Sequence, residues 1–236
     1  MKNGDAGTIL RAVTNPLKIK SLLRGAWCGV GAAALAACPH RSQSTTPEPT
    51  APLPTAGVAA QQVGITPLTL IVAEDSLHWQ PLLGERRAAL AKGDSVIGAL
   101  LKTRAPEVTW LLPDELRRAA RRAPGIAPDP DQMGTAILVR GGGREEMLPD
   151  PLRNELRTLA ALVGAGGGRF MLVPAGLVFR RTTGPPPRPS ATAELTVVMV
   201  DVRTGRVGFR TVARGEGDDP WTALTRAVKR LTPGLP

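Results

Sequence analysis

Three residue types are scarce in this 236-residue chain, and each scarcity excludes a kind of chemistry. The sequence has two cysteines, two histidines and no tyrosine, and aromatic residues make up 3% of it. So few thiols and imidazoles exclude a zinc finger, a disulfide-rich secreted scaffold and a cysteine or histidine protease. The scarcity of aromatic side chains also argues against single-stranded nucleic-acid binding, in which bases stack on aromatic rings.

Glycine is abundant, but its clusters form no cofactor motif. Residues 164–168 are followed by Arg169 and are expected to connect a helix to a strand, whereas a dinucleotide-binding loop runs from a strand into a helix. Residues 141–143 precede Arg144 without the Lys-Ser or Lys-Thr pair of a nucleotide-binding P-loop. We therefore expect no cofactor and no metal site, and interpret both segments as connectors.

Basic residues exceed acidic ones, 30 against 20, which gives a formal charge of +10. Such an excess favours polyanionic partners or membrane surfaces. Only six of the basic residues are lysines, however, and the chain is rich in Arg, Ala, Gly and Pro, which GC-rich codons encode. Codon composition explains part of the excess, and a functional basic face is the alternative. We expect no nucleic-acid partner.

A short apolar segment near the N-terminus is typical of a secretory signal. Residues 26–37 are uncharged and follow Lys18, Lys20 and Arg24. Twelve residues are too few to cross a bilayer as a helix. The segment ends in Leu35-Ala36-Ala37-Cys38, which resembles the lipobox of bacterial lipoproteins.

The lipobox resemblance implies cleavage between Ala37 and Cys38 and attachment of lipid to Cys38. Cys28 would be removed with the signal, so the mature chain would carry no free thiol, which suits an oxidising compartment. Its formal charge would be +6, because residues 1–37 contain five basic residues and one acidic residue. Pro39, rather than aspartate, follows the cysteine, and the enterobacterial sorting rule then implies delivery to the outer membrane, facing the periplasm.

Three segments are expected along the chain. Residues 1–37 form the signal peptide, and residues 38–66, rich in Pro, Ser and Thr, form an extended tether. Residues 67–236 form the folded domain. Its periodicity predicts strands at 68–73, 108–112, 170–179, 191–202 and 206–213. Helices are predicted within 83–104, after Pro113, from Asp150 and from Pro220.

This order predicts an α/β (α+β) domain: a single mixed sheet of about five strands with helices packed on it. The last strand pair flanks Arg203-Thr204-Gly205, a glycine-containing hairpin turn, and a helix follows the pair. Residues 195–209, with Asp201, Gly205 and Phe209, resemble the hairpin of envelope α/β domains found in TolB, CsgG and LpoB. The resemblance implies a role in the cell envelope, but the transmembrane hairpins of pore formation have no counterpart here.

Two groups of residues are candidates for a functional site. Four arginines, Arg117, Arg118, Arg121 and Arg122, lie at helical spacing after Pro113 and could bind an anionic lipid, a cell-wall polymer or an acidic protein. Glu74 and Asp75 follow the first predicted strand, close to His78, at a position where α/β catalytic sites often occur.

Two hypotheses for function follow. The first is a lipid-anchored envelope protein whose non-catalytic α/β domain binds or scaffolds an envelope protein or cell-wall partner. The alternative is an envelope hydrolase or transferase that uses the carboxylates near Glu74 and Asp75.

Overall fold

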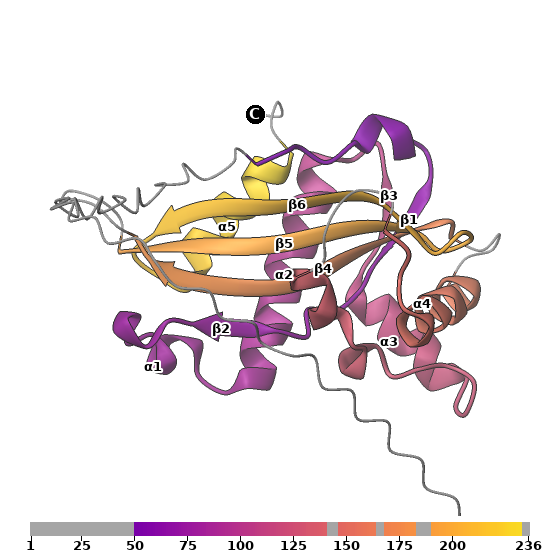
Figure 1. Ribbon diagram of the computed structural model, residues 1–236, viewed down its shortest axis with the longest axis horizontal. Helices are drawn as coiled ribbons and strands as arrows, with labels where there is room; N and C mark the ends of the chain where they lie inside the picture. Colours follow the sequence, from indigo (N-terminus) through magenta and orange to yellow (C-terminus); the bar gives the residue numbers. More distant parts are fainter. Residues whose placement is uncertain (1–49, 141–145, 164–167, 183–189, 233–236) are drawn as a thin grey trace, which may run out of the picture. The chain divides into compact units, whose positions relative to one another are not determined.

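The computed structural model describes residues 50–140, 146–163, 168–182 and 190–232, which form one mixed β-sheet with helices packed on it (Figure 1). The strands are β1 (Gln62–Ile65), β2 (Ile71–Ala73), β3 (Thr109–Leu111), β4 (Phe170–Arg181), β5 (Ala191–Asp201) and β6 (Arg206–Gly217). The α-helices are α1 (Gln80–Leu83), α2 (Arg86–Arg104), α3 (Pro113–Arg122), α4 (Asp150–Val163) and α5 (Pro220–Leu231). Short 3₁₀ helices are η1 (Thr55–Val58), η2 (Asp75–Leu77), η3 (Pro130–Gln132) and η4 (Thr135–Val139).

The sheet follows the order β3-β1-β4-β5-β6, and β2 also pairs with β4. β1 is parallel to both β3 and β4, and β2 is parallel to β4. β5 is antiparallel to β4 on one side and to β6 on the other. Val63 of β1 lies opposite Phe170, and Ile71 of β2 lies opposite Leu177. β1 and β2, which are consecutive in the sequence, therefore pair with two successive parts of β4.

Both faces of the central strands are buried. On β5, Val197 belongs to a core cluster with Leu224 of α5 and Ile97 of α2. The neighbouring Val198 belongs to a second cluster with Leu156 of α4 and Leu116 of α3. Figure 1 shows α2 and α5 passing behind the long strands. This two-faced burial explains why β4 and β5 are nearly continuous apolar runs in the sequence.

The start of the folded domain lies earlier than expected. Residues 50–66 were assigned to the tether, but β1 lies between β3 and β4 inside the sheet, and Val63 is fully buried. Leu53 is also buried, and its N–H donates to the carbonyl of Leu231 over 2.8 Å. Thr50 contacts the outer edge of β6, where its hydroxyl donates to the Val212 carbonyl over 3.3 Å. The expected boundary at residue 67 is corrected to residue 50 or earlier.

The gap between β1 and β2 lies beside a break in the hydrogen-bond register of β4. The register of β4 shifts between Pro174 and Gly176, as predicted from the proline and glycine within its apolar run. Beside it, residues 67–70 leave the ladder, and the Leu68 N–H donates to the Asp94 carboxylate of α2 over 2.8 Å. A side chain at Gly176 would collide with Val139, so glycine allows η4 to approach the sheet.

The predicted fold class is confirmed as a mixed α/β domain, with six strands where about five were expected. All five predicted strands are present, as are the four predicted helices and the hairpin turn at Arg203-Thr204-Gly205, where Gly205 has a φ of 74°. β1 is the strand that the sequence analysis missed.

Candidate functional site

Helix α3 carries the four candidate arginines, and local sequence explains where it begins. Pro113 occupies its first turn, where a missing N–H costs nothing. The Glu115 carboxylate accepts a hydrogen bond from the Leu112 N–H over 2.7 Å, and the Glu115 N–H donates back to the Leu112 carbonyl. This reciprocal pair is a capping arrangement that satisfies groups otherwise left open at a helix start. Leu116 and Ala119 bury the opposite face of the helix.

Arg117 differs from the other three arginines because carboxylates surround its guanidinium group. Its guanidinium lies 2.6 Å from Asp94 of α2, 2.9 Å from Asp114 and 2.7 Å from Asp131 of η3. Its side chain is 18% exposed. Burial alone would lower the pKa of Arg117, but the hydrogen bonds to Asp131, Asp94 and Asp114 raise it above its usual range. Arg117 therefore joins α2, α3 and η3 and is not free to bind a partner.

Asp94 is the buried member of this network, at 6% exposed. Burial raises the pKa of Asp94 to about 6, and the hydrogen bonds from Leu68 and Arg117 offset only part of that effect. Sequence analysis missed Asp94, although a signal was present. Asp94 lies on the same helical face as Ile97 and Leu101, so a polar residue interrupts an apolar stripe.

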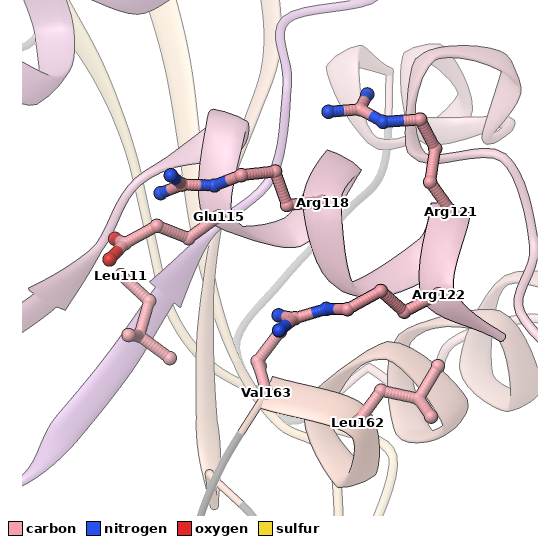
Figure 2. Close-up of a pocket in the computed structure, with 7 residues that line it drawn as sticks. All are labelled: Leu111, Glu115, Arg118, Arg121, Arg122, Leu162 and Val163. Carbon is pink, nitrogen blue, oxygen red and sulfur yellow. The ribbon is translucent and has the colours of Figure 1, made fainter.

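Arg118, Arg121 and Arg122 line a hollow of about 480 Å³ between α3 and the C-terminal turn of α4. Leu111, Glu115, Leu162 and Val163 complete its lining. Figure 2 shows the Arg118 guanidinium nearest Glu115 and the Arg122 guanidinium beside Val163, whereas Arg121 extends away from both. Within the described part of the chain, these three arginines form neither a hydrogen bond nor an ion pair. The hollow can therefore accept an anion.

The alternative site near Glu74 is not assembled as a catalytic group. The Glu74 carboxylate accepts the Arg181 N–H over 2.7 Å, at the end of β4, and so supports the β2–β4 pairing. Asp75 begins η2, and His78 ends it in the left-handed backbone region, at a φ of 52°. The hollow of about 760 Å³ that Glu74 lines, next to η4, is not lined by Asp75 or His78. None of the hollows found along the described residues with Glu74 in its lining also includes Asp75 or His78.

The predicted cleavage and lipidation residues, Ala37 and Cys38, lie outside the described residues. Over the ranges that are described, no helix is long and apolar enough to cross a membrane. Those same ranges contain no group of three or more His, Cys, Asp or Glu side chains placed to hold a metal ion.

No protein-family model matches the chain, and no curated protein matches it. Three solved structures show a distant likeness. The PelC dodecamer from Paraburkholderia phytofirmans aligns with a TM-score of 0.32 at 12% identity, over 79% of this chain and 92% of that one. The hypothetical protein CT253 from Chlamydia trachomatis gives 0.33 at 13% identity, over 66% and 73%. E. coli LpoB gives 0.26 at 13% identity, over 89% and 90%. Likenesses this distant carry no functional argument.

Proposed function

We propose that this protein is a lipid-anchored component of the bacterial cell envelope whose α/β domain binds an envelope partner without catalysing a reaction. Cys38 is the proposed lipid attachment point, and the outer membrane, facing the periplasm, is the proposed location. The observation that carries the binding role is the hollow lined by Arg118, Arg121 and Arg122, whose cationic groups have no partner within the described residues.

The contrast with the other arginines supports a binding role for this hollow. Other arginines of the described residues are paired with carboxylates, as Arg169 is with Asp201 at 2.9 Å and Arg180 with Glu194 at 3.0 Å. Burial alone would raise the pKa of Asp201, but hydrogen bonds from Arg169, Thr204 and Arg203 lower it. Arg118, Arg121 and Arg122, by contrast, have no carboxylate partner among the described residues.

A non-catalytic role is supported by what the carboxylates near β2 do. Acid–base catalysis needs two groups at a defined separation in a shared site. Glu74 instead receives a backbone N–H of β4, and Asp75 and His78 lie at the two ends of η2, outside the hollow beside Glu74. Their positions are explained by the local structure.

The anchor is tested by metabolic labelling with palmitate in a bacterial host. We expect label on the wild-type chain and on a Cys28→Ser variant, because Cys28 lies in the segment that is removed. A Cys38→Ser variant should carry none. An unlabelled wild-type chain would exclude the lipid anchor. If the wild-type chain is labelled, separation of the inner and outer membranes tests in which of them the protein lies.

The binding role is tested by crosslinking in the native envelope. We expect a reproducible crosslinked species with wild type that is lost in an Arg118→Gln/Arg122→Gln double variant. The matched control is Arg230→Gln, which removes an exposed arginine from the last turn of α5, away from the hollow. If the double variant and the control crosslink equally, the hollow is not the binding site.

A further inference from the structure

We propose that the hollow between α3 and α4 binds a phosphate group, held chiefly by Arg118 and Arg122. The proposal rests on the binding function proposed above and gives the partner a chemical class. The phosphate can belong to a lipid headgroup or to a soluble phosphorylated molecule, and the test below separates these two sources.

The charge of the lining favours an anion. Three arginines and Glu115 give the hollow a net formal charge of +2. The C-terminal turns of α3 and α4 contribute about half a negative unit each, so the surroundings of the hollow stay net positive by about one unit. A phosphate monoester carries about 1.5 to 2 negative charges at neutral pH, whereas a carboxylate carries one.

The arrangement of the side chains favours a tetrahedral anion over a planar one. Arg118 and Arg122 are one helical turn apart, and both side chains extend in the same direction from α3, Arg118 toward Glu115 and Arg122 toward Val163 (Figure 2). A carboxylate has two oxygens in one plane, so it accepts from two guanidinium groups only where their donors approach near that plane. A phosphate has three or four oxygens in different directions, so it can accept from two guanidinium groups at once.

The surroundings strengthen such a contact. Leu111, Leu162 and Val163 provide aliphatic walls that are partly shielded from water. Charge-assisted hydrogen bonds gain strength where nonpolar walls lower the local dielectric constant. Glu115 forms no ion pair with either arginine among the described residues; its carboxylate accepts the Leu112 N–H at the start of α3, and its charge offsets one of the three arginine charges.

The test uses the full chain with Cys38→Ser, which prevents lipid attachment, and titrates it with inorganic phosphate and, separately, with acetate by calorimetry. We expect phosphate to bind at least about tenfold more tightly than acetate. The Arg118→Gln/Arg122→Gln variant should lose at least about tenfold in phosphate affinity, since a charge-assisted hydrogen bond contributes about that factor. Arg230→Gln should bind phosphate as wild type does.

A lysine variant separates bulk charge from guanidinium geometry. Arg118→Lys/Arg122→Lys keeps the charge but loses the two-pronged donors, so we expect an affinity between those of wild type and the glutamine variant. Thermal melts of every variant should agree with wild type to within a few degrees, because both side chains are exposed and unpaired. Equal affinity of phosphate for wild type and the glutamine variant, or equal affinity of acetate and phosphate, would overturn the proposal.

Vesicle flotation distinguishes the two sources of phosphate. Binding to vesicles that contain phosphatidate, above the level seen with phosphatidylcholine alone and lost in the glutamine variant, assigns the site to a lipid headgroup. Phosphate binding in solution without this gain assigns it to a soluble ligand. If neither probe binds but the envelope crosslink still depends on Arg118 and Arg122, the phosphate assignment fails while the binding function stands.

Discussion

Asp94 shows how one residue positions several elements at once. Its two carboxylate oxygens do different work: one accepts the Leu68 N–H at the break between β1 and β2, and the other accepts from Arg117 on α3. A buried N–H without an acceptor costs about 1 to 3 kcal/mol. Asp94 thus supplies an acceptor that the broken strand needs and also fixes α3, the helix that bears the arginine hollow.

Asp94 makes the stability of the domain depend on pH in an unusual direction. Burial raises the pKa of Asp94 to about 6 from an ordinary value of 3.8, so the folded state holds a proton that the unfolded state has lost. The stabilising contribution is therefore complete below pH 3.8 and is lost as pH rises through about 6. We expect the free energy of unfolding, measured with urea, to fall by roughly 2 kcal/mol between pH 4 and pH 7.

Asp94→Asn is the matched control for this pH dependence. It keeps an oxygen for the Leu68 N–H and cannot titrate, so the fall in stability between pH 4 and pH 7 should disappear. Asp219 acts at lower pH, because hydrogen bonds from Thr222 and Trp221 at the start of α5 lower its pKa. Its contribution is lost as pH falls through that lowered value. A slope between pH 4 and pH 7 that survives in Asp94→Asn would contradict the assignment.

The pairing of Arg117 with Asp94 gives a second prediction at the residue scale. Arg117→Gln leaves the Asp94 carboxylate buried without its cation, and we expect a loss of about 3 kcal/mol at pH 7. Adding Asp94→Asn should recover part of that loss, because the unpaired charge is removed. A double-mutant cycle of urea unfolding measures this coupling. Simple additivity of the two substitutions would show that the ion pair does not govern stability.

Among the elements, those with a strong periodic pattern could be predicted and β1 could not. α4 and α5 show apolar residues at helical spacing after a clear start, such as Asp219-Pro220, and the structure confirms both. β1 has four residues, and its Gln62 and Gly64 are weak strand formers that follow a proline-rich segment. It is a strand because β3 and β4 pair with it from both sides, a tertiary effect that its own sequence does not carry.

The contact between β6 and α5 depends on glycines in the strand. A Cβ at Gly215 would collide with the backbone of Ala227 and Ala223, which cannot yield as a flexible side chain can. We expect Gly215→Ala to destabilise the domain by about 3 kcal/mol or more. Gly208→Ala on the same strand should change stability by less than about 0.5 kcal/mol, because its Cβ would lie 3.8 Å from the nearest atom, the Met199 carbonyl oxygen. Urea unfolding of both variants tests the difference.

For the whole molecule, the sequence showed where the arginines lie but not which of them are free. The four arginines are near neighbours on one helix, yet Arg117 pairs with Asp94 and Asp131, which are 23 and 14 residues away. Arg118 and Arg122 lie instead against the end of α4. The packing of α2, α3, η3 and α4 determines that Arg117 is paired and that Arg118 and Arg122 are not. The spacing of arginines along α3 does not predict this difference.

The corrected domain boundary gives a prediction that applies to the whole fold. Deleting residues 50–66 removes β1 from between β3 and β4 and takes away the segment that contacts the edge of β6, so we expect this variant not to fold. Deleting residues 40–46, which the composition assigns to the tether, should leave the Tm unchanged. Circular dichroism melts of the two deletions in the otherwise full chain measure the contrast. A cooperative melt near the wild-type Tm for the 50–66 deletion would restore the boundary at residue 67, because it would show that the sheet forms without its inner strand.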